Sequence, residues 1–526
     1  MAVSITWLCE LNEGIHARPA GYIARLCNLF QAAIDWENTR TGLRANAKSA
    51  LSLIASDTLL NDECRITLSG KDEQQAAARL RALLADLPTF SLHTEPVVSQ
   101  GYLPRCLREL NPQVIQGTRL HQGVAKARPQ VMQSLTFADL IDRTPGQADG
   151  IGNETARFLA GLASLRGEKQ RALRQTRGIE HDLIAAHLTL IDDGEFQEAT
   201  IGYLNGGMNA WSAIVRVSLD VCEQLEKSSS HYLQERTLDL LDIATQLIGA
   251  AYGERALGHR PLLLTEPAIV FASHLTPSLL LALDRSRLVG LVLSSTGKTS
   301  HTAILARWLG IPTLADVDFT ELTLDAERPV VIDAGSGILI VHPDENVLRY
   351  YRQEIAVQEE MQRLRVNTAL GKDSARVGET PLLTAEMILW RMDARDKNEA
   401  IKMMVDNLWL QRRTDARDKL CDDIWAREVP FPTVVGSGFA IPHARTDAIH
   451  DSTLSVATLR QPIAWGGVMV DTLFMLTISQ TAQDNAHMKH FSTLARMLMN
   501  DEFVSRIKQA NGPEALYTLI SQTLAC

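Results

Sequence analysis

The stretch TGKTSHTAILARWLGIP, residues 296–312, is the most informative part of the sequence for fold and function. His301 follows two hydroxyl residues, Thr299 and Ser300, and opens an amphipathic stretch that predicts a helix. The apolar run 288–293 directly before it predicts a buried strand, so strand, turn and helix indicate an α/β fold. A neutral imidazole can attack a phosphoryl group and later release it, because the nitrogen–phosphorus bond is labile. Taken alone, the same pattern also fits a helix cap.

Two further histidines stand in comparable settings. His16 lies in NEGIHARPA, residues 12–20, where Arg18 could bind phosphate oxygens at a helix start. His443 lies in GSGFAIPHAR, residues 436–445, after a glycine turn and a strand-like run. A capping role for His16 and a core role for His443 are the plain alternatives. Three histidines in comparable motifs, in three separate segments, indicate successive phosphate carriers of a phosphoryl relay.

The composition limits which classes of protein the chain can belong to. A chain of 526 residues predicts several domains, and a formal net charge of -10 makes nucleic acid and anionic membrane poor partners. The 7 cysteines form no C-x-x-C pair, which indicates reduced thiols and no zinc site. The N-terminus lacks a signal-like segment, and the most apolar stretch, 261–293, is broken by charges and prolines. We therefore expect a cytosolic protein without membrane insertion.

Hydrophobic periodicity and proline placement predict five segments. The first, 1–90, reads as a small α+β layer, with strands at 4–10, 34–38 and 64–69 and helices at 19–30, 47–53 and 72–84. A proline-containing linker covers 91–113. An α/β unit covers 114–345, with a helical insert at 148–252. A linker containing a charged helix, 345–365, covers 346–379, and a second α/β unit covers 380–526.

The first segment resembles HPr, the histidine carrier of the bacterial sugar phosphotransferase system. The matching stretches are residues 12–20 and 46–50. The resemblance implies an open-faced sandwich, phosphorylation of His16 on the ring nitrogen nearer the chain, and a supporting role for Arg18. Ser49 matches a position that is a regulatory phosphosite in some HPr proteins. Packing or helix capping is the alternative that we favour for Ser49.

The second unit resembles the N-terminal part of enzyme I, including its swivelling phosphohistidine domain. Residues 296–312 match the phosphohistidine loop, which implies that His301 carries phosphate and that Thr299 and Ser300 support it. The helical insert resembles the HPr-binding helices, at 187–193 and 232–242, and 331–343 resembles the closing strands. Enzyme I usually has two glycines where this chain has Thr296-Gly297, and the bulkier Thr restricts the loop backbone.

Residues 380–526 resemble the fructose/mannitol-type IIA domain. The resemblance implies that His443 accepts the phosphoryl group, with Arg427 and His487 neutralising and hydrogen-bonding it. A structural role for His487 stays open. The IIA likeness implies delivery of phosphate to a fructose-type IIB/IIC permease.

Together the three resemblances point to a multiphosphoryl transfer protein that lacks one part. Enzyme I's second half is a phosphoenolpyruvate-binding barrel of roughly 250 residues, and only residues 344–380 are available for it here. We therefore expect a relay that exchanges phosphate with HPr or enzyme I supplied in trans. No cofactor is expected, since Mg²⁺ would be needed only with the barrel. The alternative is a regulatory, phosphate-dependent binding protein without a transport role.

Overall fold

The computed structural model describes most of the chain. The described residues are 2–11, 14–15, 17–87, 103–226, 237–258, 262–295, 301–320, 322–369, 381–430, 432–480, 493–494, 496–498 and 500–524, with the backbone alone at 17, 18, 86, 179, 226, 301 and 365–369. They form two compact units. The first consists of Met1–Gly101 and Gln113–His342, and the second of Tyr102–Pro112 and Pro343–Cys526.

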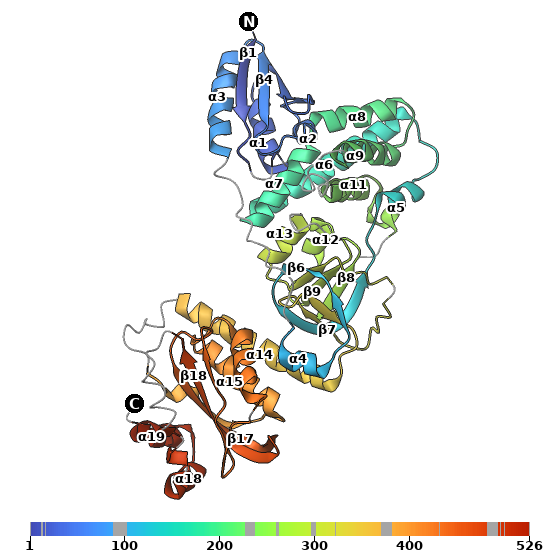
Figure 1. Cartoon of the computed structure of the whole chain (residues 1–526). Helices are drawn as coiled ribbons and strands as arrows, with labels where there is room; N and C mark the ends of the chain where they lie inside the picture. Colours follow the sequence, from blue (N-terminus) through green and yellow to red (C-terminus); the bar gives the residue numbers. More distant parts are fainter. Residues whose placement is uncertain are drawn as a thin grey trace. The chain divides into compact units, whose positions relative to one another are not determined.

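A four-stranded antiparallel sheet begins the first unit. Its order is β1-β4-β2-β3, with bounds β1 Val3–Leu8, β2 Ala33–Asn38, β3 Arg44–Asn46 and β4 Glu63–Ser69. Three helices cover one face (Figure 1): α1 Ala17–Cys27, α2 Ala50–Ala55 and α3 Glu73–Asp86. Alternate residues of β2 and β4 are buried, because successive side chains of a strand point to opposite faces. This is the predicted open-faced sandwich, and only β3 lacked a sequence signal.

A helical bundle follows the sandwich, within the predicted insert 148–252. Its helices are α6 Ile151–Gln175, α7 Ile179–Ile191, α8 Gly194–Asn205, α9 Ala210–Glu226 and α11 Thr237–Tyr252. A short helix, α5 Phe137–Asp142, leads into it. Trp211 is fully buried at the centre, and its Nε1 donates to the Leu140 carbonyl at 2.6 Å. The apolar faces of these helices pack on one another, as the sequence periodicity predicted.

An eight-stranded mixed sheet completes the first unit. Its order is β5-β12-β11-β7-β8-β9-β10-β6, with bounds β5 Val114–Gln116, β6 Thr118–His121, β7 Val124–Met132, β8 Ala268–Ala272, β9 Leu288–Leu293, β10 Thr313–Ala315, β11 Val330–Asp333 and β12 Ile338–Ile340. The neighbours β7, β8, β9 and β10 run parallel. Helices α12 Pro277–Ala282 and α13 His301–Trp308 connect them, so the predicted α/β character is observed.

The second unit is built on a six-stranded sheet. Its path is β13-β17-β18-β15-β14, and β16 pairs with β18. The bounds are β13 Ile388–Met392, β14 Val434–Gly436, β15 Phe439–Ala440, β16 His443–Thr446, β17 Thr453–Trp465 and β18 Val468–Ser479. The helices of this sheet domain are α15 Lys397–Leu410, α16 Arg417–Glu428, α18 Asp501–Lys508 and α19 Pro513–Leu524. The long hairpin β17–β18 turns at Gly466 and Gly467, whose φ angles of 58° and 87° favour glycine.

Two segments from outside the predicted IIA-like range pack on this domain. One is α4 Arg105–Leu110, within the stretch expected as a linker, and the other is α14 Glu345–Ala369, the expected charged helix. The Arg105 guanidinium lies 4.6 Å from the Trp425 ring centroid, and Arg349 on α14 pairs with Glu399 on α15 at 2.6 Å. The domain boundaries drawn from the sequence remain predictions.

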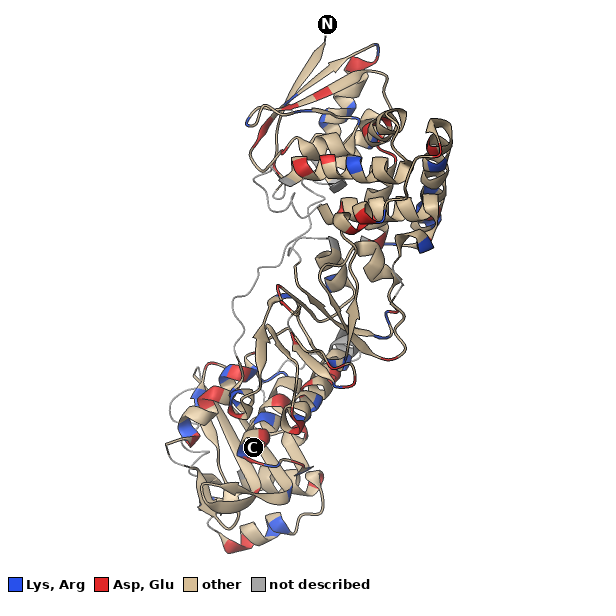
Figure 2. Cartoon of the chain, turned by 90° about the vertical axis from the view of Figure 1, so that its right-hand side faces the viewer, with Lys and Arg blue, Asp and Glu red and all other residues tan. Residues whose placement is uncertain are grey.

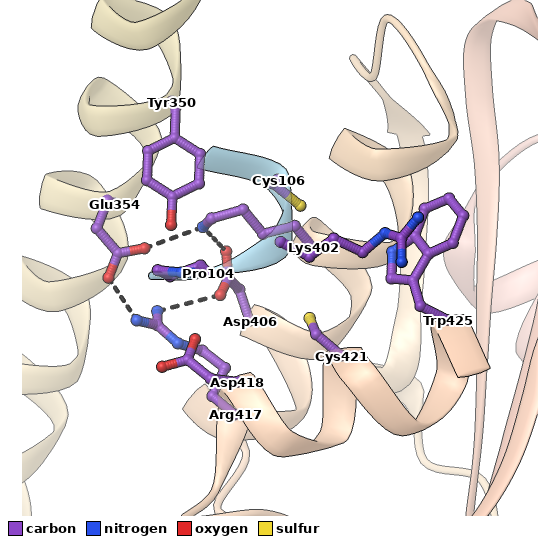
Figure 3. A pocket seen from close by; sticks show the side chains of 11 residues that line it. Pro104, Cys106, Tyr350, Glu354, Lys402, Asp406, Arg417, Asp418, Cys421 and Trp425 are labelled. Carbon is purple, nitrogen blue, oxygen red and sulfur yellow. Dashed lines mark hydrogen bonds and ion pairs between the residues drawn. The ribbon is translucent and has the colours of Figure 1, made fainter. Parts of the chain in front are cut away.

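Four paired charges, three of them buried, join α14 to the domain. Figure 3 shows Lys402 and Arg417 each between the carboxylates of Glu354 and Asp406. The Lys402 Nζ to Glu354 Oε2 distance is 3.0 Å, and the Arg417 Nη1 to Asp406 Oδ1 distance is 3.1 Å. Glu354, Lys402 and Asp406 are at most 6% exposed. We call these four residues the charge ring.

Pairing shifts the pKa values of Glu354, Lys402 and Arg417. Burial alone would raise the pKa of Glu354, but Lys402 and Arg417 outweigh burial and lower it to about 2. Burial alone would lower the pKa of Lys402, and Asp406 and Glu354 instead raise it. Figure 2 shows acidic and basic residues interspersed among the helices of this unit, where opposite signs can pair. None of the helices in the described ranges combines the length and apolar character that crossing a bilayer requires.

Candidate phosphoryl-transfer sites

His443 is the predicted acceptor that the structure describes in full. It begins β16, which runs parallel to β18 with His443 opposite Leu476. The Nδ1 atom of His443 lies 2.9 Å from the Ile441 carbonyl oxygen. Because a carbonyl oxygen only accepts, we assign the proton to Nδ1. The lone pair of the half-buried ring is then on Nε2, which is the nitrogen able to attack phosphorus.

A tight glycine turn positions the chain that leads to His443. Gly436, Ser437 and Gly438 have φ angles of 93°, 53° and 84°. A Cβ added at Gly438 would lie 3.2 Å from Asp471 Oδ2 and from Lys508 Nζ, which form an ion pair. The turn therefore needs glycine at 438 for two reasons, backbone conformation and close approach. Phe439, fully buried, then anchors the strand.

Helix α16 packs beside β16 and carries Arg427 in its last turn. Two polar contacts join α16 to the end of this strand. Lys419 pairs with Asp447, and one helical turn later the Thr446 hydroxyl donates to Asp423 at 2.5 Å. Both contacts lie at the Thr446 end of β16, and Arg427 follows Asp423 by one helical turn, with its side chain exposed.

The end of α16 is fixed by Glu428, whose role the sequence did not reveal. Its carboxylate is 1% exposed, pairs with Lys397 at 2.7 Å and accepts from Trp465 Nε1 at 3.0 Å. A buried carboxylate with a cation and a ring N–H is a stable anchor. Arg427 is thereby carried on a fixed helix end. His487, the second predicted partner of His443, lies outside the described residues.

His301 is the first residue of α13, which follows the carboxyl end of the parallel strand β9. Its side chain and residues 296–300, including Thr299 and Ser300, lie outside the described set. The next residue, Thr302, is buried and its hydroxyl donates to the Leu275 carbonyl at 2.6 Å. Arg307 Nε donates to the Leu120 carbonyl at 2.8 Å. The helix that begins at His301 is therefore tied at both ends to the sheet domain.

His16 and the Arg18 side chain also lie outside the described set, although the chain on both sides is placed. Helix α1 begins at Ala17, directly after His16. Gly14 has a φ of 69°, and a Cβ there would lie 2.3 Å from the Thr58 carbonyl oxygen. The Ile15 amide donates to that same oxygen at 2.9 Å. The glycine turn before His16 is thus enforced by close packing.

The sandwich docks on the helical bundle through Ser49. Its side chain caps α2 by accepting from Ser52 N, as the favoured alternative in the sequence predicted. Its hydroxyl also lies 2.8 and 3.0 Å from the two Asp193 carboxylate oxygens, and Leu51 N donates to the same carboxylate at 3.2 Å. Asp193 also caps α8. Asp193 belongs to the stretch expected to bind an HPr-like partner.

Arg25 adds a second docking contact that the sequence did not indicate. Its Nη2 donates to the Ala185 carbonyl and to the Thr189 hydroxyl, both at 2.8 Å. Thr189 also lies against Gly21, where an added Cβ would meet its hydroxyl at 3.2 Å. Arg25 lies 160 and 164 positions from these two partners, so no local pattern could pair them. Helix α1 therefore contacts α7 through these polar groups in addition to the apolar residues that the two parts share in one hydrophobic cluster.

Four family models match the chain, and together they cover most of it. They are "PTS HPr component phosphorylation site" at residues 3–86, "PEP-utilising enzyme, N-terminal" at 116–236, "PEP-utilising enzyme, mobile domain" at 264–337, and "Phosphoenolpyruvate-dependent sugar phosphotransferase system, EIIA 2" at 381–523. The mobile-domain match contains His301, and the last match contains His443 and Arg427.

Known multiphosphoryl transfer proteins match about two thirds of the chain. Multiphosphoryl transfer protein 2 of Escherichia coli (strain K12) is 40% identical over 362 residues, which cover 68% of this chain and 43% of that protein. The chain thus spans less than half the length of that relative. Among solved structures, an Enzyme I (nEIt) protein determined by NMR in solution is 24% identical with a TM-score of 0.34, covering 46% of this chain and 99% of that one.

A solved complex of mannitol IIA with phosphorylated mannitol IIB from Escherichia coli matches the last part. It is 18% identical with a TM-score of 0.23, covering 27% of this chain and 96% of that one. Within the chain, the matched domains include no phosphoenolpyruvate-binding barrel. The chain is multiphosphoryl transfer protein-like, with an HPr domain, the N-terminal and mobile domains of enzyme I, and a type-2 IIA domain.

Proposed function

We propose that the chain passes a phosphoryl group between His16, His301 and His443. The observation that carries this proposal is the docking of the HPr-like sandwich on the enzyme I-like bundle through Ser49 and Asp193. Donor and acceptor parts of one exchange are then held within one compact unit. Holding two reactants together removes much of the entropic cost of their encounter.

Each step exchanges one nitrogen–phosphorus bond for another. The lone pair of the accepting imidazole attacks phosphorus in line, and the donor imidazole leaves as its bond to phosphorus breaks. No electron or metal is consumed. Arg18, with Thr299 and Ser300, would support the phosphoryl group at the first two histidines. These side chains are assigned on the family likeness.

At His443 we assign Nε2 as the attacking atom, since Nδ1 faces the Ile441 carbonyl. Arg427 is assigned as the cation that meets the transferred oxygens. Lys419 and Asp423 tie α16 to Asp447 and Thr446 beside β16, and Arg427 lies one turn after Asp423 on the same helix. A guanidinium there would stabilise charge that develops during transfer. His487 is kept as a further phosphate-supporting residue.

The phosphate donor and the final acceptor lie in other proteins in this proposal. Residues 344–380 are too few for a phosphoenolpyruvate-binding barrel, so enzyme I or HPr in trans would supply the phosphate. Type-2 IIA domains hand phosphate to IIB partners, as the mannitol complex illustrates for its own chains. We propose a fructose-type IIB/IIC permease as acceptor and a cytosolic location for the relay.

The experiment is a labelling test on the whole chain. Radiolabelled phosphoenolpyruvate with Mg²⁺ is supplied first to the chain alone, and then with separate enzyme I and HPr. We expect no labelling in the first reaction and labelling of His443 in the second. Equal labelling in both reactions would reveal a donor site in the chain, and label at other residues than His16, His301 and His443 would refute the relay.

A further inference from the structure

The HPr-like sandwich covers one face of the helical bundle, and the bundle side of this contact consists of acceptors. They are the Ala185 carbonyl, the Thr189 hydroxyl oxygen and the Asp193 carboxylate. Ala185 and Thr189 are four residues apart and therefore lie on one face of α7, and Asp193 follows as the cap of α8. We call these three residues the docking face.

The sandwich side of the contact presents donors. The Arg25 guanidinium on α1 donates to the docking face, as do the Ser49 hydroxyl and the Leu51 amide at the start of α2. Donors on one side and acceptors on the other make the contact complementary. The docking face therefore fits a carrier that presents a guanidinium and the start of a helix in this arrangement.

The contact is closed to a second protein while the sandwich is docked. Ser49 is 1% exposed, Asp193 4% and Leu51 6%. Helix α1 contacts α7, and α2 contacts α7, α8 and α9. Buried apolar residues of the sandwich and of the bundle belong to one hydrophobic cluster. Another carrier can reach Asp193 only after the sandwich has left.

A sandwich in the same chain competes well for the docking face. Linking two binding partners makes their association intramolecular, with an effective concentration in the mM range for short flexible linkers. A separate carrier of equal intrinsic affinity at micromolar concentration is then outcompeted. The covalent connection, rather than stronger contacts, gives the chain's own sandwich its advantage.

We propose that the docking face is reserved for the chain's own sandwich and is closed to a separate carrier of the HPr fold. A separate carrier binds there only when the sandwich undocks. Within the relay, phosphate on His301 is then exchanged with His16 of the same chain. The proposal goes beyond the relay, because it concerns which carrier docks and requires no phosphate on any histidine.

The test is hydrogen exchange of the full chain with and without separate, unphosphorylated HPr, read by mass spectrometry of peptides from residues 179–205. Ser49→Asp places a second carboxylate against Asp193 and should release the sandwich by like-charge repulsion. An aspartate at this position still caps α2, and the bundle itself is unchanged. The matched control is Ser4→Asp, which adds the same charge at an exposed position of β1.

In the unchanged chain and in Ser4→Asp we expect slow exchange of these peptides that HPr does not alter. In Ser49→Asp we expect faster exchange, which added HPr slows again. Half of this slowing should need an HPr concentration lower by about tenfold or more than any effect in the unchanged chain. Arg25→Ala should act in the same direction with a smaller effect, because it removes only the contacts to Ala185 and Thr189.

Equal slowing by HPr in the unchanged chain and in Ser49→Asp would overturn the proposal, because the docking face would then be open. Exchange in Ser49→Asp that HPr does not slow would also overturn it, because the freed face would not accept a separate carrier. Unaltered exchange in Ser49→Asp without HPr would show that the sandwich does not depend on this contact, with the same consequence. None of these outcomes involves phosphate transfer, so each is distinct from a failure of the relay.

Discussion

Two buried contacts in this chain use carboxylates in opposite ways. Between the sandwich and the bundle, the single carboxylate of Asp193 accepts from Ser49 and Leu51. In the second unit, Glu354 and Asp406 are each bound by both Lys402 and Arg417 (Figure 3). The first contact rests on hydrogen bonds to a single buried carboxylate. The second is a closed, neutral set that no single water can replace.

The difference suits different tasks in a relay. A carrier domain has to leave its docking site to hand on phosphate, so a few hydrogen bonds worth about 1 kcal/mol each are appropriate. Helix α14 does not have to dissociate from its domain. Breaking the charge ring would leave buried ions without partners, which is costly. We therefore expect the sandwich to be held reversibly and α14 permanently.

The largest effect is expected from Glu354→Gln. It leaves the buried Lys402 and the half-buried Arg417 with one carboxylate between them, which should cost about 3–5 kcal/mol of unfolding free energy. Urea denaturation followed by tryptophan fluorescence measures this. The control is Glu360→Gln on the exposed face of the same helix, expected to change stability by less than about 0.5 kcal/mol. Equal midpoints for the two variants would show that the ring does not hold α14.

Arg427→Ala should slow phosphorylation of His443 by about 10²-fold, because a lost donor to developing charge costs a factor of this size. The rate is read by quenched-flow labelling with phospho-HPr. Arg506→Ala, an exposed arginine on α18, is the control for a general loss of positive charge. An unchanged rate in Arg427→Ala would mean that the residue lies away from the transfer path.

Asp193→Ala should weaken docking of the sandwich by about 2 kcal/mol, from lost hydrogen bonds and a lost cap on α8. Hydrogen exchange of the Leu51 amide, which donates to Asp193, reports it directly. We expect faster exchange there and unchanged exchange in the second unit. Arg25→Ala should act in the same direction but more weakly, whereas Arg79→Ala on the exposed face of α3 should have no effect.

The charge ring should make the stability of the second unit depend on pH in the acid range. The pKa of Glu354 is lowered to about 2 in the folded chain, mainly because Lys402 and Arg417 outweigh its burial. A depressed carboxyl pKa gives stability that is complete above the unfolded value, about 4.3, and is lost as pH falls toward the folded value. Stability of the second unit should therefore fall between about pH 4.3 and 2, and Glu354→Gln should flatten this dependence. An identical pH profile in the variant would contradict the assignment.

The sequence was informative where burial is continuous or strictly periodic. The strand predicted at 288–293 was found with those bounds, because an apolar run flanked by polar residues leaves little choice. The helix predicted at 345–365 was found as α14 Glu345–Ala369. Strand β3 was missed, since it has three residues with only Ala45 buried.

Long-range pairings could not be predicted. Lys402 and Asp406 are four residues apart and could be expected to pair on a helix, but Glu354 and Arg417 join them from other helices. The Ser49–Asp193 contact links residues 144 positions apart. The acceptor histidines were predicted from motifs and family likeness, and their roles remain predictions because His16 and the His301 side chain lie outside the described set.

One measurement tests the relay most directly. The whole chain and its His16→Ala variant are incubated with phosphoenolpyruvate, Mg²⁺ and enzyme I, with no separate HPr, and phosphohistidines are mapped by mass spectrometry over time. The relay predicts phosphate on His16 and then on His443 in the unchanged chain, and none on His443 in the variant. Phosphate reaching His443 at the same rate in His16→Ala would contradict it.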